Sequence, residues 1–544
     1  MSWASRRRER RTGLCSGARY YREPHRLLKP KAKVLNSPEE SFATPSAAPR
    51  IIPRSEHAIS RSHISPNALR VLYRLRDGGF KAFLVGGCVR DLLIGMEPKD
   101  FDVATDALPE EVKRLFRNCR LVGRRFRLAH VFFGREIIEV ATFRAATAPS
   151  QGDEPLPEAD PEDGEAPELD EASELDDSLL DMDAPIARTR PAAAQAGRAP
   201  SQRDAEQDDA TDARRFDASG RILRDNVYGT IDEDVWRRDF TANALYYNIA
   251  DFSLWDYVHG AQDIAARTLR LIGDPETRFR EDPVRMLRAA RFEAKLGFSI
   301  DPQTAAPIAK LRELLGGVPS ARLFDETLKL FLTGHGARGF EVLRRRGLLA
   351  ALLPSVDAYF SSHPDSLVEK LVMEGLRNTD GRVRADKPVT PTFLFALLLY
   401  GPIAGLIEKQ PPERWHELAT ILEACDRATR EAQSRVALPK RFSLGVREMF
   451  ALQPRLEHPR GRRALRVLEH PRFRAGYDLL LLRAQYGLAS ADMAQWWTRI
   501  QEVSAEERGR MADALAGDGA PRAPQGARRR SRRRRRGPGP STSA

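Results

Sequence analysis

The sequence lacks any apolar run long enough to cross a membrane, since a spanning helix needs about 20 predominantly apolar residues. The longest apolar run lies around residues 393–400 and is expected to form a buried helix. The first residues are basic, yet no apolar segment of the kind found in secretory signals follows them. These absences favour a cytoplasmic protein without a membrane partner.

Cysteine is also scarce. Four cysteines are scattered along the chain, with no Cys-x-x-Cys pair and no histidine at a metal-ligand spacing: Cys15, Cys88, Cys119 and Cys425. This pattern argues against a disulfide framework and against a structural zinc site.

Basic residues are absent from residues 151–183, which carry 15 acidic residues. Because the whole chain has a formal net charge of +12, the remainder carries +27. Such a basic remainder favours a polyanionic partner such as nucleic acid, although charge also serves solubility. The acidic stretch belongs to a low-complexity segment, 145–215, that is expected to be a disordered insert.

The length of 544 residues exceeds what one hydrophobic core usually organises. Short strands and helices alternate up to about residue 272, and helical periodicity then continues to about residue 499. We therefore expect an α+β fold in which a small α+β domain precedes a long all-α region.

A predicted strand is followed by Gly86-Gly87 and a helix, and Asp100-Phe101-Asp102 comes shortly after. Glycines let the backbone approach a ligand closely, and amides at a helix start bind phosphate. If the two aspartates lie on a strand, they share a face and repel each other unless a cation lies between them. Mg²⁺ suits such a site, and two metal ions would activate a hydroxyl and stabilise leaving pyrophosphate. An isolated Asp-x-Asp is more often a solvated strand edge, but the adjoining turn favours the metal.

Residues 84–91, which read Leu-Val-Gly-Gly-Cys-Val-Arg-Asp, and the Asp-x-Asp after them resemble the first motif of one family. It is the class II tRNA nucleotidyltransferase and bacterial poly(A) polymerase family. The resemblance implies that Asp100 and Asp102 hold two catalytic Mg²⁺ ions. It also implies that the triphosphate of the nucleotide is bound by Gly86, Gly87 and Arg90.

The same resemblance, which covers about residues 57–483, implies a head on a small mixed sheet, with a helical neck and body. The expected parts are a disordered basic N-terminus (1–60), the head (61–272, interrupted by 145–215), a neck for nucleotide selection and RNA binding (273–345), an RNA-binding body (346–500) and a disordered arginine-rich tail (501–544).

Arg237-Arg238-Asp239 resembles a second family motif, which implies that Asp239 is the third catalytic carboxylate and that Arg237 and Arg238 contact the nucleotide. Two alternatives remain open. Glu139 lies on a predicted strand, 137–141, that could run beside the Asp-x-Asp strand, so it is a rival neighbour of the metal. Asp239 could instead cap a helix over residues 243–247.

Residues 280–288 resemble a third family motif, assigned to nucleotide selection. Asp282 before a proline is a typical helix start, and Arg285 and Arg288 lie one turn apart on that helix. A template-independent enzyme must read the base with protein groups alone, so the expected nucleotide-binding residues here are Glu281, Asp282, Arg285 and Arg288. The alternative is an ordinary helix cap with ion pairs.

Three further segments resemble the poly(A) polymerase branch of the family: residues 121–131, 438–442 and 470–479. This implies transfer of AMP from ATP to RNA 3′ ends with release of pyrophosphate, in mRNA polyadenylation linked to RNA decay. RNA-decay machinery is then an expected partner, and the arginines of the tail would bind RNA phosphates without sequence preference. The alternatives are a CCA-adding tRNA nucleotidyltransferase and a catalytically silent RNA-binding protein.

Overall fold

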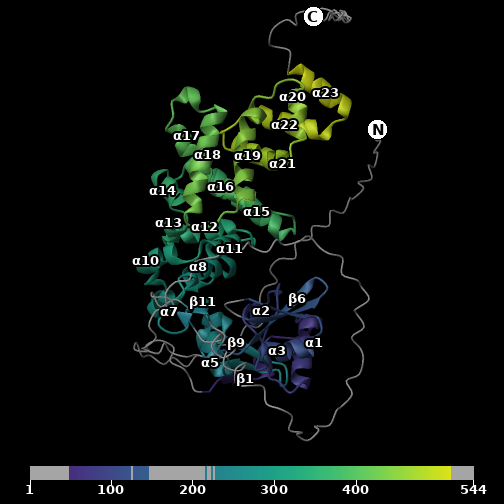
Figure 1. The fold of residues 1–544 in the computed structure, drawn as a ribbon, viewed down its shortest axis with the longest axis vertical. Helices are drawn as coiled ribbons and strands as arrows, with labels where there is room; N and C mark the ends of the chain where they lie inside the picture. Colours follow the sequence, from purple (N-terminus) through teal and green to yellow (C-terminus); the bar gives the residue numbers. More distant parts are fainter. Residues whose placement is uncertain (1–47, 124–126, 146–214, 217–221, 225–226, 516–544) are drawn as a thin grey trace, which may run out of the picture. The chain divides into compact units, whose positions relative to one another are not determined.

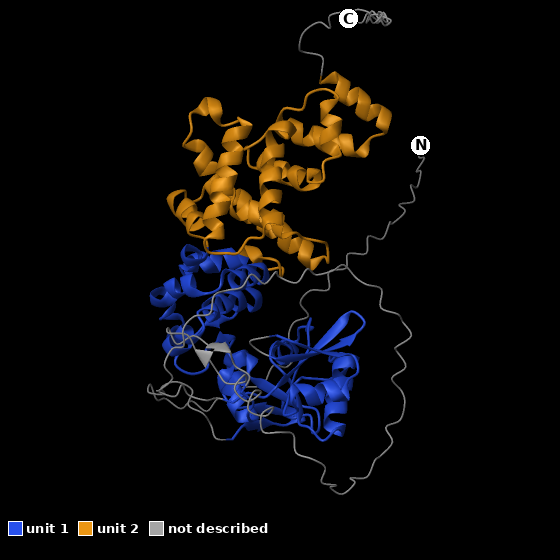
Figure 2. Cartoon of the chain, viewed as in Figure 1, with its two compact units in different colours: residues 1–330, 338–352 blue, residues 331–337, 353–544 orange. Residues whose placement is uncertain are grey.

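The computed structural model describes residues 48–123, 127–145, 215–216, 222–224 and 227–515 (Figure 1). Residues 1–47, 146–214 and 516–544, for which disorder was expected, lie outside the described residues. Residues 124–126 lie outside them as well. The chain divides into two compact units, residues 1–330 with 338–352 and residues 331–337 with 353–544 (Figure 2). The first unit contains a mixed sheet and the described part of the second is helical, which confirms the α+β fold.

The sheet has eight strands in the order β1-β10-β9-β2-β3-β6-β5-β4. Neighbouring strands are antiparallel, except that β3 and β6 are parallel. The strands are β1 (Arg50–Ile52), β2 (Ala82–Val85), β3 (Asp102–Thr105), β4 (Cys119–Val122), β5 (Leu128–Phe133), β6 (Glu136–Thr142), β9 (Leu245–Asn248) and β10 (Leu254–Asp256). The predicted hairpin is present, because β5 and β6 pair on either side of a turn at Gly134.

Two shorter pairings lie outside this sheet. Strand β11 (Thr268–Leu269) is parallel to β12 (Ser299–Ile300), and β7 (Arg215–Phe216) is antiparallel to β8 (Ile222–Arg224).

One face of the sheet is covered by α1 (Pro66–Asp77) and α3 (Pro109–Leu115), which contact each other and several strands (Figure 1). The hydroxyl of Ser65 accepts hydrogen bonds from the amides of Asn67 and Ala68, so α1 begins at a serine cap followed by proline. On this face the side chains of alternate strand residues, including Tyr247 of β9, point toward the side that carries α1 and α3.

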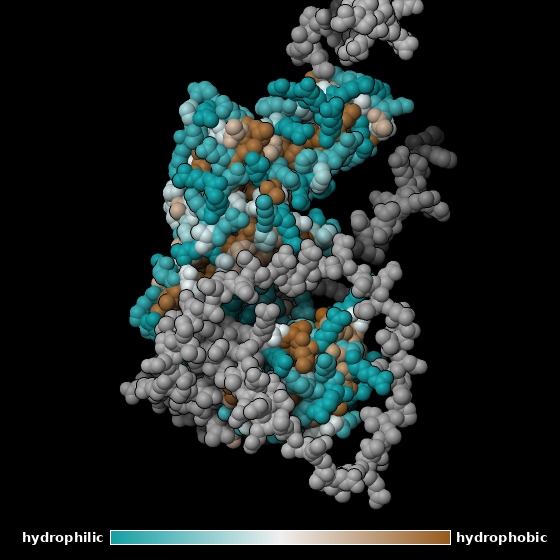
Figure 3. Space-filling view, in the orientation of Figure 1, coloured by the Kyte–Doolittle hydropathy of each residue, from teal (hydrophilic) through white to brown (hydrophobic). Residues whose placement is uncertain are grey.

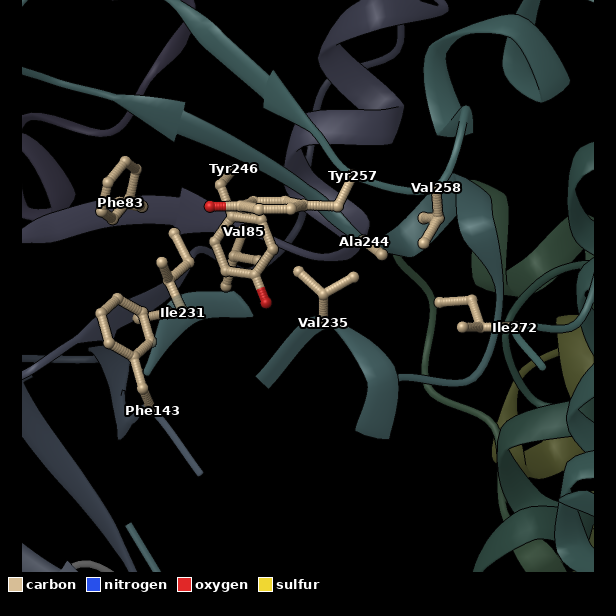
Figure 4. Packing of buried hydrophobic residues seen from close by; sticks show 11 residues of the cluster. Phe83, Val85, Phe143, Ile231, Val235, Ala244, Tyr246, Tyr257, Val258 and Ile272 are labelled. Carbon is tan, nitrogen blue, oxygen red and sulfur yellow. The ribbon is translucent and has the colours of Figure 1, made fainter. Parts of the chain in front are cut away.

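The opposite face packs on α5 (Ile231–Arg237). Phe83, Val85 and Tyr246 of the strands belong to one buried cluster with Val235 of α5, and the ring of Tyr257 lies beside that of Tyr246 (Figure 4). Residues directly opposite each other on paired strands share a face, and Asp102 pairs with Val85. Asp102 therefore lies on the α5 face of the sheet.

The disorder expected for residues 1–60 is wrong from residue 50 onward. Strand β1 adds to the sheet by pairing with β10, and Ile52 and Ile59 are buried. A few apolar side chains and the hydrogen-bonding edge of β10 order this segment despite its polar composition. The head therefore begins before residue 61.

Helices dominate beyond the sheet. They are α2 (Gly87–Leu93) and α6 (Gly260–Ala265) in the head and then α7 (Pro275–Glu281), α8 (Val284–Leu296), α9 (Pro302–Ala305), α10 (Ile308–Leu311), α11 (Ser320–Phe331), α12 (Gly336–Arg345), α13 (Leu348–Leu352), α14 (Pro354–Ser362), α15 (Leu367–Arg384), α16 (Pro391–Leu398), α17 (Tyr400–Glu408), α18 (Leu418–Gln433), α19 (Lys440–Glu457), α20 (Arg463–Leu468), α21 (Phe473–Gln485), α22 (Ala491–Glu502) and α23 (Ala505–Ala514). Polar side chains dominate the visible surface of these helices, and apolar ones form small patches (Figure 3).

The disorder expected from residue 501 is also wrong for its first part. Helix α23 begins at a serine cap, Ser504, and the carboxylate of Asp513 forms an ion pair with Arg462 at 2.9 Å. In the described residues no single helix has the length and apolar composition to span a membrane. One pair, α16 and α17, meets that test jointly but bends by 44° between its halves.

Candidate active site

The turn between β2 and α2 is the centre of the site. Gly86 has φ of 81° and ψ of −139°, a conformation that glycine adopts without steric cost. A Cβ added to Gly86 would lie 3.4 Å from Oδ2 of Asp102 and 3.9 Å from Nη1 of Arg238. The expected glycine turn therefore lies against one of the predicted carboxylates and one of the predicted arginines.

Asp102 is the first residue of β3, whereas Asp100 precedes the strand and is exposed. The sequence predicted that a strand would hold both aspartates on one face, but only Asp102 belongs to the strand. Burial raises the pKa of Asp102 to about 6, and the negative charges of Glu139 and Asp100 add to that rise, while Arg238 opposes it. The carboxylate of Asp102 consequently lies among other carboxylates with one cation nearby.

Glu139 lies next to Asp102, because β3 and β6 pair in parallel with these two residues in register. On its other side Glu139 faces His130 of β5, with 3.6 Å between the ring Nε2 and a carboxylate oxygen. The side chain of Glu139 is half exposed, so its carboxylate remains open to solvent and to a ligand.

The donor set around Asp102 suits a hard cation. Carboxylate oxygens are the ligands that Mg²⁺ takes from proteins, and a cation near Asp102 would offset its desolvation and the charges of Glu139 and Asp100. Within the described residues no group of three histidine, cysteine, aspartate or glutamate side chains is close enough to hold a metal ion alone. Such a site would therefore need phosphate oxygens or water to complete it, as is usual for Mg²⁺.

Arg238 is held in place from two sides. Its Nε donates to the hydroxyl of Tyr246 at 2.7 Å and its Nη2 to Asp234 at 2.9 Å, and the Tyr246 hydroxyl donates to the same carboxylate. Nη1, the nitrogen nearest Gly86, has no hydrogen-bond partner among the described residues. This arrangement orients one guanidinium edge toward the glycine turn. Arg237 is the last residue of α5.

Arg90 is engaged within the fold. Its side chain is buried, and its guanidinium donates to Asp91 through Nε and Nη2 and to Asn243 through Nη1 at 2.6 Å. In this arrangement Arg90 joins α2 to the 3-10 helix Thr241–Asn243.

Asp239 is equally engaged. Both Nε and Nη2 of Arg288 donate to its Oδ2, at 2.8 and 2.6 Å, and Asn243 and the Phe240 amide donate to its Oδ1. Burial raises the pKa of Asp239, but Arg288 and these hydrogen bonds outweigh burial and hold the pKa well below its usual range. The helix proposed over residues 243–247 is absent, since Leu245–Asn248 is strand β9, which pairs with β2 and β10.

The four residues expected to select the base lie at the junction of α7 and α8, and all are ion-paired. Oε2 of Glu281 accepts from Arg285 at 3.0 Å and from Arg278 at 2.6 Å. Asp282 accepts two hydrogen bonds from Arg322, at 2.8 and 2.7 Å. Asp282 also accepts from the amide of Val284 at 3.3 Å, which agrees with its predicted place at a helix start.

Sequence reasoning missed several partners of these groups, namely Arg278, Arg322, Asp234 and Tyr246. Arg322 is 40 positions from Asp282, so no local pattern connects them. The capping box at Thr230 and Glu233, which fixes the start of α5 and hence Asp234, was a readable local signal.

A glycine turn between a strand and a helix, beside paired carboxylates on a mixed sheet, defines the class of template-independent nucleotidyltransferases. Residues 82–270 match the Poly A polymerase head domain, 297–360 the probable RNA and SrmB- binding site of polymerase A, and 413–536 the polymerase A arginine-rich C-terminus. Poly(A) polymerase I of Salmonella typhi is 44% identical over 507 residues, 92% of this chain and 95% of that protein. Poly(A) polymerase I of Haemophilus influenzae is 39% identical over 465 residues, 84% and 89% of the two chains. The chain belongs to the bacterial poly(A) polymerase I family, so it is an RNA nucleotidyltransferase that adds adenylate.

CCA-adding enzymes are more distant relatives. That of Bacillus velezensis is 31% identical over 292 residues, which is 54% of this chain and 56% of that protein. Among solved structures, the Thermotoga maritima CCA-adding enzyme complexed with tRNA aligns with a TM-score of 0.47 and 17% identity, over 87% of this chain and 96% of that one. The 44% identity to a poly(A) polymerase I over 92% of this chain, against 31% over 54% for the CCA-adding enzyme, confirms the predicted poly(A) activity over its CCA-adding alternative.

Proposed function

We propose that Asp102, with Asp100 beside it, holds Mg²⁺ where the head joins AMP from ATP to an RNA 3′-hydroxyl. The observation that carries this proposal is the position of Asp102, half-buried, in register with Glu139 and against the turn at Gly86. Bound metal would supply charge neutralisation at the phosphates and activation of the hydroxyl.

The residues of the chain would then position the triphosphate. The turn at Gly86 and Gly87 admits the phosphates close to the backbone, since side chains there would fill the space beside Asp102. Nη1 of Arg238 is the guanidinium donor directed at this turn, and its two hydrogen-bonded partners keep it there without reorganisation during the reaction. We assign Arg237, at the adjacent end of α5, to the same ligand.

For the third carboxylate, the geometry favours Glu139 as the neighbour of the metal, because it is in register with Asp102. Asp239 remains essential in this proposal through a different role. By receiving both donors of Arg288, it holds α8 against the segment that follows α5. Arg90 has a comparable role for α2.

Selection of adenine is assigned to Glu281, Asp282 and Arg285, with Arg288 fixing the helix that carries Arg285. Their present partners satisfy each charge, so reading a base edge requires that at least one ion pair be exchanged for hydrogen bonds to adenine. Partial exposure of Arg322, 33% for its side chain, leaves room for that exchange.

The RNA substrate is proposed to be the 3′ ends of mRNA and other transcripts in the cytoplasm, where added tails lead the RNA to decay machinery. The match to an RNA-binding family segment at residues 297–360 and to an arginine-rich segment at 413–536 supports binding of many RNA ends through phosphate contacts.

Primer extension tests the proposal. A short generic RNA is incubated with Mg²⁺ and each nucleoside triphosphate separately, and we expect a long ladder with ATP alone. Asp102→Asn should lower the rate by roughly 100-fold or more, whereas Asp77→Asn, an exposed carboxylate paired with Arg76, should not. Near-normal activity of Asp102→Asn contradicts the metal assignment. Addition of CMP and AMP to a truncated tRNA, without an ATP ladder, contradicts the poly(A) assignment.

A further inference from the structure

A pocket lies on the face of the sheet opposite Asp102, where the segment preceding α1 meets β9. Its volume is about 300 Å³, and it is lined by Arg54, Ser60, Arg61, Ser62, Tyr247 and Phe252. Because successive strand residues point to opposite faces, Tyr247 faces away from Tyr246 and its partner Arg238. This pocket is therefore separate from the proposed active site.

The pocket lining includes two arginines and, within the described residues, no carboxylate. Nη1 of Arg54 donates to the carbonyl of His57 at 3.0 Å, and Nη1 of Arg61 donates to the hydroxyl of Tyr73 at 3.1 Å. Neither guanidinium forms an ion pair with any of the described residues. Most donors of both groups are thus left for a ligand, since each guanidinium has five N–H bonds.

Tyr247 lines the same pocket. Its side chain is only 1% exposed, but its hydroxyl oxygen is open to solvent and forms no hydrogen bond with the described residues. Burial raises the pKa of Tyr247, Arg54 and Arg61 lower it, and Tyr73 and Asp251 raise it further. The hydroxyl is therefore a further donor that a ligand in the pocket can reach.

The remaining wall is also made of donors. The hydroxyls of Ser60 and Ser62 are 2.9 Å apart, so one of them donates to the other and the second keeps a proton for an outside acceptor. The aromatic face of Phe252 is covered by Arg61, whose guanidinium carbon lies 4.7 Å from the ring centre. With no carboxylate and little free apolar surface, the pocket suits neither a cation nor an apolar ligand.

We propose that this pocket binds a phosphate group of a nucleic acid strand or of a free nucleotide. A phosphate offers several acceptor oxygens and up to two negative charges, which match two guanidinium groups and the hydroxyls around them. The inference does not depend on the metal site, because binding here requires neither catalysis nor Asp102.

The test uses the full chain in EDTA. A fluorescently labelled 20-nucleotide oligo(A) is titrated with the protein at several KCl concentrations, and ATP binding is measured separately by calorimetry. The variants are Arg54→Gln, Arg61→Gln and Tyr247→Phe, and the matched control is Arg70→Gln, an exposed arginine of α1 that contacts Asn67.

If RNA supplies the phosphate, Arg54→Gln and Arg61→Gln should each weaken RNA binding about five- to tenfold. The slope of log K against log salt should fall by about 0.7 for each, as for one lost phosphate contact. Tyr247→Phe should weaken binding without changing the slope, because no charge is removed, and Arg70→Gln should bind like the unaltered protein.

If a free nucleotide supplies the phosphate, RNA binding stays constant, and the calorimetric stoichiometry for ATP falls from two per chain to one in Arg54→Gln and Arg61→Gln. The proposal is overturned if both arginine variants match Arg70→Gln in RNA affinity, salt slope and ATP stoichiometry. Circular dichroism spectra that match the unaltered protein ensure that losses are not due to misfolding.

Discussion

Replacing Asp102 by asparagine should remove activity and at the same time stabilise the metal-free protein. The reason is that the Asp102 carboxylate is partly buried beside Glu139 and Asp100, so that desolvation and repulsion raise its pKa from 3.8 to about 6. A carboxyl group that is protonated more easily in the fold than in the unfolded chain destabilises the fold once it is ionised.

The sign and size follow from that shift. As pH rises from 3.8 to about 6, the unfolded chain loses its proton first and the fold loses stability; above pH 6 the penalty is constant. At about 1.36 kcal/mol per pKa unit, the penalty at pH 8 is at most about 3 kcal/mol. Asparagine carries no charge, so Asp102→Asn should recover it, which corresponds to a rise in Tm of about 5–10 °C for a unit of this size.

Thermal unfolding in EDTA, followed at several pH values, measures the effect. The gain of Asp102→Asn should be largest at pH 8 and should disappear near pH 4, while Mg²⁺ should raise the Tm of the unaltered protein more than that of the variant. Asp77→Asn serves as the control, because its exposed ion pair should change stability by less than about 1 kcal/mol. A variant that is no more stable at pH 8, or that gains equally from Mg²⁺, would refute the reasoning.

Three other outcomes are expected. Arg288→Ala leaves Asp239 buried without its cation and should cost about 3–5 kcal/mol in urea unfolding, part of which the double variant with Asp239→Asn should recover. Gly86→Ala should lower the free energy of unfolding by about 1–3 kcal/mol, because Gly86 has a positive φ. The control is Gly95→Ala, since Gly95 also has a positive φ but has open space around it. In primer extension, Gly86→Ala should lower kcat/KM for ATP more than Gly95→Ala does. Trp497→Ala should lower the free energy of unfolding by about 3–5 kcal/mol, because it removes a fully buried ring and its hydrogen bond to the Leu456 carbonyl at 2.7 Å. Trp497 belongs to the second unit, so equilibrium binding of an ATP analogue should be unchanged if the nucleotide contacts only the first unit.

The sequence predicts those parts of the site whose residues are close together along the chain. The strand, the glycine pair and the helix that follows it lie within one short segment, and the hairpin of β5 and β6 joins two adjacent segments. Local hydrogen bonding and side-chain alternation determine these features, so their pattern is visible in the order of residues. The place of Glu139 beside Asp102, which the sequence left open, depends instead on the parallel pairing of β3 with β6.

Where sequence reasoning failed, distant residues decided the outcome. Residues 50–52 look like a disordered arm until β10 offers an edge to pair with, about 200 positions later. The segment after Asp239 has a plausible helix start, yet pairing with β2 and β10 converts Leu245–Asn248 into a strand. Tertiary pairing overrides local propensity in both cases.

Charge neutralisation explains why the predicted arginines and carboxylates have such different surroundings. Arg90, Asp239 and Asp282 are conspicuous in the sequence, but each has a partner of opposite charge that neutralises it within the fold. Asp102 has carboxylates as neighbours and one shared cation, and Arg54 and Arg61 form no ion pair with any of the described residues. The charges that hold elements together are thus balanced within the fold, whereas those that we propose to face a ligand are not. Since the pairs Arg288–Asp239 and Arg322–Asp282 join residues 40 or more positions apart, motif order alone does not predict which charged residues remain available for binding.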